Sequence, residues 1–345
     1  MRTAIFGTGF IAGVHKKSML ELGGTLSLVV GHTVEKAKAF AEGTDAVCAD
    51  ALEDYMLDLF DCAIICTPPS AHVETVEKCL KAGKHVLCEK PLCLDTDQAK
   101  YLAELAEKSN AITGVNFNNR FYPSVNIMKD ELKNAAQPLL VSGHYFQQYH
   151  VMPVGYSWRY KDPLRATSEI GSHILDLVRY TTGKEIVSLN SQFLVLQEER
   201  VLKDGMLYAE GEGEKVLVPS DDAAAITMRL SDGGLANIII SEISPGRVNE
   251  LTLEVSTTEG AISWNGEDPH KLCRGVKSGI SVQEDGMPGG FMDTFIYAIR
   301  AFYQSVNTNV RDPRLCTFHD AYINVALCNA IYESAHNDGK CIRMK

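Results

Sequence analysis

A short glycine turn directly after an N-terminal apolar segment constrains the fold of this chain more than any other feature. Residues 3–6 predict a buried strand, and Gly7, Gly9 and Ala12 follow at the spacing of a strand-to-helix turn. Gly7 allows the tight turn, Gly9 lets the backbone approach a pyrophosphate, and Ala12 lets the next helix pack closely on the strand. The alternative is a glycine-rich turn without a ligand. The residues expected to cradle a dinucleotide are Gly7, Thr8, Gly9, Phe10, Ile11 and Ala12.

A second segment places a lysine at the end of another predicted buried strand. Residues 85–88 are mostly apolar, and Glu89, Lys90 and Pro91 follow them. The strand belongs to the same alternating series of strands and helices as the glycine turn. In such layered sheets ligands bind outside the carboxyl ends of the strands. We therefore expect a cofactor and a catalytic cation at one crevice.

The end of the second predicted strand, residues 26–30, lacks the acid that commonly holds the ribose 2′-hydroxyl of NAD. Gly31, His32 and Thr33 follow this strand, and Lys36 lies in the next predicted helix. The glycine leaves space, and the other three side chains could bind a 2′-phosphate by hydrogen bonds and charge. This pattern favours NADP, with NAD as the alternative. Lys36 could also be a solvated helix residue.

Length, charge and cysteine usage narrow the class of protein. A chain of 345 residues with 45% hydrophobic residues suggests two domains with full cores. The net charge of −11 argues against a nucleic-acid partner, which needs a basic surface. The sequence has no long apolar stretch, so we expect a cytoplasmic protein without a membrane partner. Ten cysteines without a Cys-x-x-Cys pair do not resemble a disulfide framework, and we expect no metal site.

Strand and helix patterns alternate through residues 1–120 and predict a doubly wound parallel sheet, an α/β dinucleotide-binding domain. The pattern in residues 121–345 instead predicts an α+β domain on a large, mostly antiparallel sheet, which we expect to bind substrate and to form the contact between subunits. Asp232, Gly233 and Gly234 indicate a hairpin turn within it. Glycines and charges in residues 203–215 suggest a mobile excursion. Strands are expected at residues 139–145, 186–196, 223–230, 234–243, 250–256 and 260–264, and helices at residues 172–180, 292–307 and 317–337.

One segment of the second domain carries a candidate acid–base group. If a helix covers residues 169–176, Glu169, His173 and Asp176 share one stripe at i, i+4 and i+7. A carboxylate beside an imidazole orients the ring and favours its protonated form. Such a histidine suits a general base for a substrate hydroxyl. An ordinary helix with local ion pairs would show the same spacing.

The chain resembles the Gfo/Idh/MocA oxidoreductases over nearly its whole length. Glu89-Lys90-Pro91 is the most specific short motif of that family. Further similar segments are Gly7-Thr8-Gly9, residues 67–72, residues 83–86, residues 116–123, Trp158-Arg159, residues 169–176 and the C-terminal region from Phe318 to Lys340. The resemblance implies a Rossmann fold in the first domain. It also implies NAD(P)-dependent hydride transfer between nicotinamide and a secondary alcohol or ketone of a sugar, cyclitol or related polyol.

The resemblance also implies roles for individual residues. Lys90 matches the catalytic lysine of the family and His173 its acid–base histidine, both acting on one substrate oxygen. Glu169 stands where the family usually has aspartate, which puts its role in doubt. Further positions that match frequent cofactor contacts are Thr67, Pro68, His72, Glu89, Lys90, Asn116, Trp158 and Arg159. Candidate polyol contacts are Arg120, Tyr145, Gln147, Gln148, Tyr149, Arg165 and His173.

Two rival functions remain open at this point. One is a non-catalytic dinucleotide-binding regulator of the same fold, although the presence of both Lys90 and His173 favours an enzyme. The other is a dehydrogenase or reductase of non-sugar diols. A large sheet with helices on one face leaves an apolar face to bury, so we expect a homodimer or homotetramer.

Overall fold

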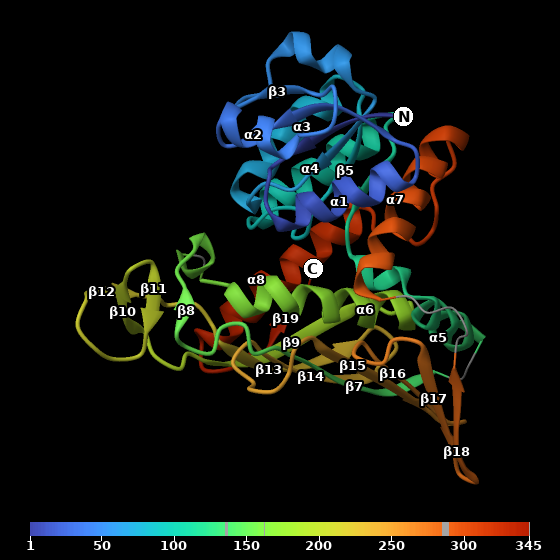
Figure 1. Ribbon diagram of the computed structural model, residues 1–345. Coiled ribbons are helices and arrows are strands. Elements are labelled where there is room, and N and C mark those ends of the chain that lie inside the picture. The colour runs from blue at the N-terminus through green and yellow to red at the C-terminus, as the bar shows by residue number, and fades with distance from the viewer. Residues whose placement is uncertain (135–136, 162, 285–289, 345) are drawn as a thin grey trace. The chain divides into compact units, whose positions relative to one another are not determined.

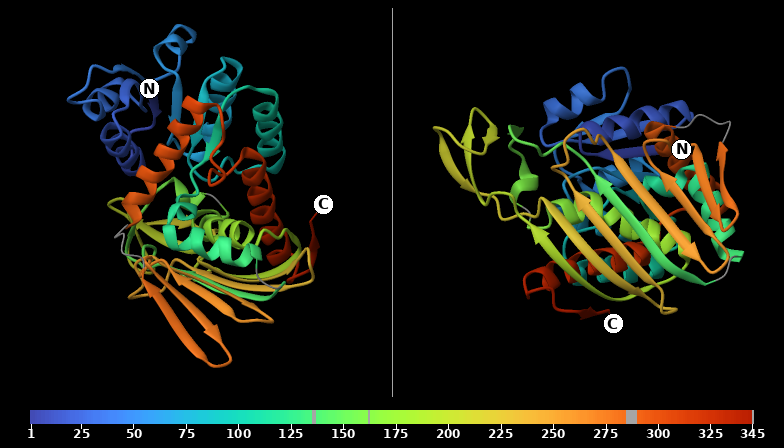
Figure 2. Two further views of the ribbon diagram at one scale, coloured as in Figure 1. Left: turned by 90° about the vertical axis from the view of Figure 1, so that its right-hand side faces the viewer. Right: turned by 90° about the horizontal axis from the view of Figure 1, so that it is seen from below.

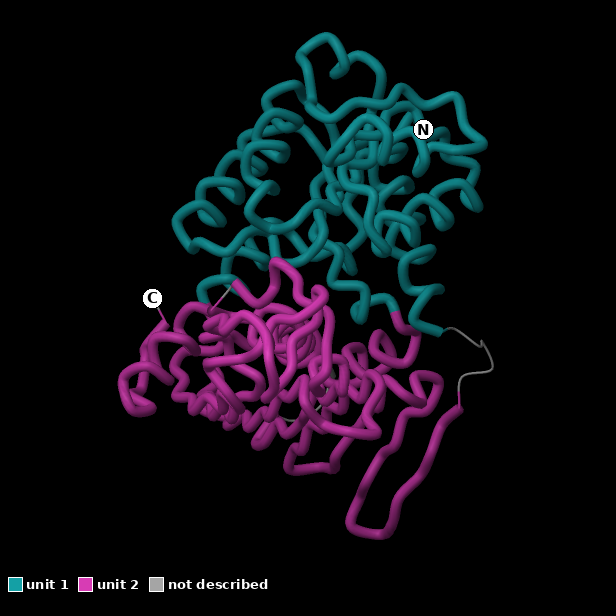
Figure 3. The backbone as a smooth tube through the Cα atoms, turned by 60° about the vertical axis from the view of Figure 1, so that its left-hand side comes forward, with its two compact units in different colours: residues 1–121, 289–326 teal, residues 122–288, 327–345 magenta. Residues whose placement is uncertain are grey.

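The computed structural model describes residues 1–134, 137–161, 163–284 and 290–344, which form two compact units (Figures 1 and 3). Unit 1 comprises Met1–Phe121 and Gly289–Ala326, and unit 2 comprises Tyr122–Pro288 and Leu327–Lys345. The domain boundary predicted after residue 120 lies one residue from the first of these divisions. The prediction placed all of the following chain in the second domain, whereas residues 289–326 return to unit 1.

Unit 1 is built on a six-stranded parallel sheet in the order β3-β2-β1-β4-β5-β6. The order reverses beside β1, so the carboxyl ends of β1 and β4 border the topological switch point where such sheets bind ligands. This topology confirms the predicted doubly wound domain. The strands are β1 Arg2–Phe6, β2 Thr25–Val30, β3 Val47–Ala49, β4 Cys62–Ile65, β5 His85–Cys88 and β6 Thr113–Val115.

Four helices of unit 1, α1, α2, α4 and α7, begin after a glycine or a residue that caps the helix. Thr33 caps α2 by accepting a hydrogen bond from the Lys36 N–H, and Asp95 caps α4 in the same way. Short 3₁₀ turns occur at Asp54–Leu59, Pro69–Ala71 and Asn118–Phe121. The longer helices are α1 Phe10–Glu21, α2 Val34–Phe40, α3 His72–Lys81, α4 Thr96–Lys108 and α7 Phe291–Thr308.

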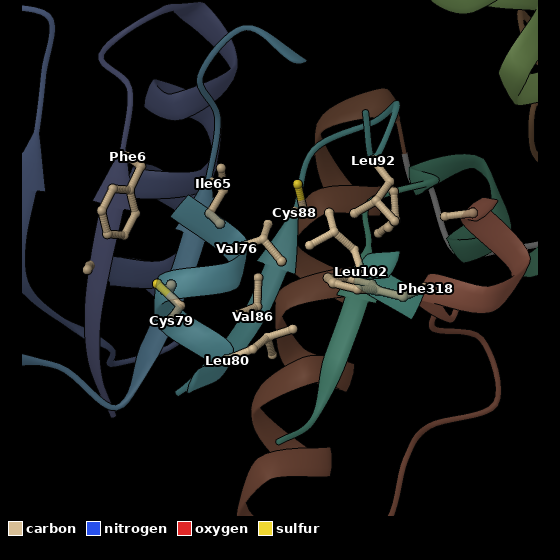
Figure 4. Close-up of a cluster of buried hydrophobic side chains, with 14 of the residues drawn as sticks. Phe6, Ile65, Val76, Cys79, Leu80, Val86, Cys88, Leu92, Leu102 and Phe318 are labelled. Carbon is tan, nitrogen blue, oxygen red and sulfur yellow. The ribbon is translucent and has the colours of Figure 1, made fainter. Parts of the chain in front are cut away.

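The core of unit 1 includes residues from the far end of the chain. Phe6, Ile65 and Val86 on the sheet and Leu102 on α4 are fully or almost fully buried in one cluster (Figure 4). Phe318 of α8, Phe318–Ala335, belongs to the same cluster. The backbone of Val115 pairs with that of Cys316 in an isolated β-bridge. The core and edge of the parallel sheet are therefore completed by residues that follow most of unit 2 in sequence.

Unit 2 contains a nine-stranded sheet in the order β18-β17-β16-β15-β7-β14-β13-β9-β19, in which only β7 and β14 pair in parallel. This sheet confirms the predicted mostly antiparallel domain. Gly233, with φ of 94°, forms the predicted turn between β13 and β14. The strands are β7 Pro138–Phe146, β9 Ile186–Leu194, β13 Ala223–Leu230, β14 Leu235–Ser241, β15 Glu250–Thr257, β16 Ala261–Asn265, β17 Lys271–Val276, β18 Gly279–Glu284 and β19 Ile342–Arg343.

Helices cover one face of this sheet, and the other face is open (Figure 2). Helices α5, Pro123–Asn134, and α6, Ser172–Thr182, contact β7, β15, β16 and β17. Buried and exposed residues alternate along β13 and β14, as expected when one face packs on helices. Ile239 on the open face is 44% exposed. Ile239 is thus an apolar side chain of the sheet that lies outside the core of unit 2.

A small four-stranded sheet occupies the region where a mobile excursion was expected. Its order is β12-β10-β11-β8, and it packs around the buried residues Tyr160, Leu207 and Val218. The sequence prediction missed these strands because they are short, and β10 and β12 are also rich in charged residues. They are β8 Val154–Gly155, β10 Glu199–Lys203, β11 Met206–Tyr208 and β12 Glu214–Leu217. Within the described ranges, no helix has the length and apolar character needed to cross a membrane.

Candidate active site

The glycine turn has the geometry of a phosphate cradle. Gly7 has φ of 100°, and a Cβ there would lie 2.6 Å from the carbonyl oxygen of Cys66 on the neighbouring strand end. A Cβ at Gly9 would have no heavy atom within 4 Å among the described residues, so this backbone faces open space. Helix α1 begins at Phe10, and no described side chain caps it. Its free N–H groups therefore fit a dinucleotide pyrophosphate.

At Gly31, directly after β2, the structure shows a packing role that was not predicted from the sequence. Gly31 is buried, and a Cβ there would lie 3.0 Å from the carbonyl oxygen of Thr33 and 3.2 Å from the Cβ of Ala37. The glycine therefore serves the close approach of α2 to β2, in addition to any role beside a ribose. His32 and Lys36 are exposed and available to a ligand.

The segment after β4 is fixed from inside by His72. Its ring is fully buried, with Nε2 2.8 Å from the carbonyl oxygen of Thr67 and Nδ1 3.1 Å from that of Pro91. Burial lowers the pKa of His72 despite these backbone contacts. His72 thus joins the turn at Thr67 and Pro68 to the loop that carries Lys90.

Glu89 and Lys90 lie at the carboxyl end of β5. One Glu89 carboxylate oxygen lies 2.7 Å from Nε2 of His15 and accepts a hydrogen bond of 2.8 Å from the Asn116 amide. The other oxygen lies 3.2 Å from the Lys90 backbone N–H. Sequence reasoning missed His15, although it continues the buried stripe of α1 with Ala12 and Met19 at helical spacing.

Arg120 lies in the 3₁₀ turn that ends the first part of unit 1. It is 4% exposed, and its guanidinium lies 3.8 Å from the carboxylate of Asp320. A direct contact between Arg120 and a substrate would use only the small exposed edge of this side chain.

Glu169 lies in a π-helical turn, and His173 lies just after it, at the second residue of α6. This turn covers Thr167–Gly171, and regular α-helix begins only at Ser172, the start of α6. The predicted α-helical stripe through Glu169, His173 and Asp176 is therefore interrupted at its first member, because π-helical hydrogen bonds run from i to i+5. His173 is 9% exposed and Asp176 is fully buried. The Tyr145 ring packs edge-on to His173, at 6.3 Å between centroids.

Arg159, with Trp158 beside it, contacts Glu169 in the π-helical turn. The Arg159 guanidinium lies over the Trp158 ring at 4.6 Å and donates a hydrogen bond of 2.9 Å to the Glu169 carboxylate. Trp158 remains 38% exposed. Two segments that the sequence analysis singled out separately, residues 158–159 and 169–173, are therefore in contact.

Arg165 is enclosed in a buried charge network. It pairs with Asp222, and Nη1 lies 3.5 Å from the Glu242 carboxylate. Arg200 of β10 also pairs with Asp222, at 2.9 Å to each oxygen. Asp221 accepts hydrogen bonds from the backbone N–H and hydroxyl of Thr167, at 2.8 and 2.6 Å. The network thus anchors the start of the π-helical turn, and Arg165 supports the site from inside.

The remaining candidate polyol contacts differ in exposure. Tyr149 is 55% exposed, whereas Tyr145 is buried and donates a hydrogen bond of 2.6 Å to Asn249. Gln147 donates to the same oxygen of Asn249 at 2.8 Å. Gln148 accepts a hydrogen bond from the backbone of Gly246.

Two sequence profiles cover most of the chain. The profile described as "Oxidoreductase family, NAD-binding Rossmann fold" matches residues 1–117, and that described as "Oxidoreductase family, C-terminal alpha/beta domain" matches residues 136–342. The chain belongs to the Gfo/Idh/MocA oxidoreductase family. The predicted resemblance is confirmed, and the glycine turn of this family member lies in an NAD-binding domain.

Several relatives of this oxidoreductase are named for sugar or inositol substrates, and one is named for a non-sugar semialdehyde. The chain is 31% identical to a levoglucosan dehydrogenase of Pseudarthrobacter phenanthrenivorans over 219 residues, 60% of this chain and 56% of that protein. This match spans little more than half the length of that relative. The chain is 24% identical over 248 residues to a myo-inositol 2-dehydrogenase of Thermotoga maritima, covering 69% and 67% of the two chains.

A solved structure confirms the fold of this family member. A levoglucosan dehydrogenase in complex with NADH and L-sorbose superposes with a TM-score of 0.90, covering 100% of this chain and 99% of that one. The sequence identity in this comparison is 22%, so the likeness concerns the arrangement of the backbone.

Proposed function

We propose that this oxidoreductase transfers a hydride between a nicotinamide dinucleotide and a secondary alcohol or ketone of a sugar, cyclitol or related polyol. The observation that carries this proposal is the Glu89-Lys90 loop, fixed at the end of β5 in an NAD-binding domain. The names of the relatives, levoglucosan and inositol dehydrogenases, support the substrate class.

The proposed chemistry divides between two side chains. When bound, the dinucleotide supplies the hydride donor or acceptor. In the oxidative direction we expect His173 to take the hydroxyl proton, while the Lys90 ammonium stabilises the negative charge that develops on the same oxygen. Glu169 acts together with Arg159, with which it forms a 2.9 Å ion pair. The residues expected to hold the dinucleotide are those of the glycine turn, the end of β2, Thr67 and Pro68.

The direct test is a substrate panel with the purified protein. Sugars, inositols and acyclic diols are supplied separately with NAD and NADP, and reduction of the cofactor is followed by absorbance. Turnover of a sugar or cyclitol supports the proposal. Turnover confined to non-sugar diols would favour the rival substrate class, and binding of dinucleotide without turnover of any compound would favour a regulator.

We also propose a preference for NADP, which rests on the end of β2. None of the three residues after β2, which are Gly31, His32 and Thr33, is acidic. Lys36 is exposed one helical turn further along. A 2′-phosphate could therefore meet the Lys36 ammonium and the His32 ring. Glu35 lies beside them in the first turn of α2 and is the acid nearest to this position in sequence.

The open face of the nine-stranded sheet supports a proposal about assembly. It holds a depression of about 630 Å³ whose lining combines polar residues, such as Asn237, Thr252 and Lys271, with the apolar residues Phe146, Ile239 and Trp264. Exposed apolar strips on a sheet face are expected to be covered by a partner. We propose that a second copy of this chain covers the face, giving a homodimer or a dimer of dimers.

A further inference from the structure

His15 is a buried histidine outside the glycine turn, on the inner side of α1. Its side chain is 1% exposed, and Nε2 lies 2.7 Å from the carboxylate of Glu89. The Phe295 ring of α7 packs edge-on to the imidazole, at 5.2 Å between centroids and 74° between planes. Packing and the carboxylate together hold the ring in one orientation.

Glu89 connects this histidine to the proposed catalytic lysine. The Glu89 side chain is 12% exposed. One oxygen is shared by His15 and Asn116, and the other faces the backbone N–H of Lys90. The Glu89 backbone N–H donates to Ile65 of β4 at 2.8 Å. The carboxylate is thus held by groups from three different segments of the chain: α1, the residue after β6 and the loop after β5.

The charge state of Glu89 makes these contacts important. Burial acts to raise the pKa of the Glu89 carboxyl, but hydrogen bonds from His15 and Asn116 and the charge of Lys90 together lower it. The carboxylate is therefore ionised near neutral pH. A buried carboxylate that loses its donors is strongly unfavourable, so the loop conformation depends on His15 and Asn116.

We propose that His15 is a positioning residue for Lys90 and acts through the Glu89 carboxylate. The inference rests on the proposed function of Lys90. It assigns Glu89 a structural task in place of the cofactor contact expected from the sequence. It also means that a single helix carries both the phosphate-facing N–H groups at its start and, about 7.5 Å further along, the group that fixes the catalytic loop.

Two substitutions of His15 separate its polar role from its volume. His15→Leu fills a similar volume with an apolar side chain and removes the donor, whereas the amide of His15→Gln can replace Nε2. We expect His15→Leu to lower kcat by about tenfold with little change in dinucleotide affinity, and His15→Gln to recover most of the loss. Equal losses in both variants would overturn the polar role. Glu89→Gln, which keeps the shape of the side chain, should lower kcat to a similar extent and covers the case in which His15→Leu does not fold.

The dependence on Lys90 is tested in a Lys90→Ala background. A residue that acts only through Lys90 should lose its effect there, so the losses should not multiply. If Lys90→Ala is impaired and His15→Leu lowers kcat by the same factor in both backgrounds, the positioning role is wrong while the role of Lys90 stands. If Lys90→Ala retains full turnover, both the role of Lys90 and the positioning role are wrong.

A measurement without cofactor or substrate completes the test. The rate at which an amine-reactive reagent labels Lys90 in the isolated protein, read by mass spectrometry, reports on the surroundings of that amine. His15→Leu should change this rate by about threefold or more and leave the rate at Lys84 unchanged. Lys84 is a suitable control because it directly precedes β5 at the opposite end of the same strand. An unchanged rate at Lys90 would contradict the proposal.

Discussion

Arg200 and Asp222 form a fully buried ion pair in which one guanidinium nitrogen lies 2.9 Å from each carboxylate oxygen. The pair joins β10 of the small sheet to the segment before β13 of the large one. Arg165 reaches the same carboxylate from the start of the segment that leads to His173. One acid therefore ties the small sheet to the π-helical turn of the candidate site.

Removing Arg200 should destabilise unit 2. Arg200→Met leaves Asp222 with one fewer cation in a buried position, and we expect a loss of about 3 kcal/mol in the free energy of unfolding. Urea denaturation followed by circular dichroism measures it. Lys215→Met is the matched control, since Lys215 pairs with Glu199 on the exposed side of the same small sheet and should cost under about 1 kcal/mol. Equal costs for the two variants would contradict the role given to the buried pair.

Two buried groups of unit 2 should give opposite pH dependences of stability. Burial raises the pKa of Asp221 to about 6, so between its ordinary value of 3.8 and about 6 the folded form binds more protons and stability falls as pH rises. Burial lowers the pKa of His150 from 6.5 to about 3, so stability falls as pH falls through that range. In the wild-type protein the two effects partly cancel.

In Asp221→Asn, the loss of stability that protonation of His150 causes at low pH should no longer be offset by Asp221. From pH 7 to about pH 4 the variant should lose up to about 3 kcal/mol more free energy of unfolding than the wild-type protein. Denaturant titrations at several pH values measure this difference. Glu199→Gln, at an exposed carboxylate of the same unit, should follow the wild-type curve. Parallel curves for Asp221→Asn and the wild-type protein would show that Asp221 does not take up this proton.

The proposed catalytic pair should show large and non-additive effects. Lys90→Ala removes the charge that stabilises the oxygen, and His173→Ala removes the proton acceptor, so each should lower turnover by ~10²-fold or more. The double variant should lose less than the product, because both groups act on one oxygen. Steady-state kinetics with a substrate from the panel gives these values, and dinucleotide titration should show affinity largely intact. Full turnover by His173→Ala would refute the mechanism.

The pH profile offers a second test of His173. A general base must be deprotonated to work, so the rate of oxidation should rise with pH through the titration of this histidine. That rise should be absent in His173→Ala. His270→Ala, at a half-exposed histidine of the same unit, is the control and should keep it.

Cofactor preference should depend on the residues after β2. Isothermal titration should show tighter binding of NADP than of NAD, and Lys36→Glu should reverse the order by repelling the 2′-phosphate. Lys38→Glu changes the same charge elsewhere on α2 and should have little effect. Gly31→Asp is a poorer test, because its Cβ would lie 3.0 Å from the Thr33 carbonyl oxygen and disturb α2 directly. Tighter binding of NAD by the unmodified protein would reject the preference.

Assembly should respond to a charge on the open sheet face. The protein should be a dimer or tetramer in light scattering at micromolar concentration, and Ile239→Glu should shift it toward monomer because it buries a carboxylate in the apolar contact. Leu217→Glu, at a 74% exposed position of the small sheet, is the control. A monomeric wild-type protein would contradict the proposed contact.

The sequence predicted unit 1 well because local signals agree there. The glycine turn, the residues that cap α2 and α4 and the alternating apolar segments each specify their own element. His15 and Glu89 meet across 74 residues of chain, and no local pattern encodes that contact. The π-helical turn at Glu169 was missed for a related reason. A carboxylate before the histidine fits an α-helical stripe, while the buried Asp221 that holds Thr167 lies far away in sequence.

The return of residues 289–326 to unit 1 has a consequence for synthesis of the protein. Phe318 and Ala321 fill the same core as Phe6, and Cys316 pairs with the backbone of Val115. A nascent chain that has emerged from the ribosome as far as residue 121 therefore lacks part of the interior of its first domain. The domain that begins first is completed only after nearly the entire polypeptide has been translated, so a fragment ending at residue 121 should expose apolar surface and aggregate.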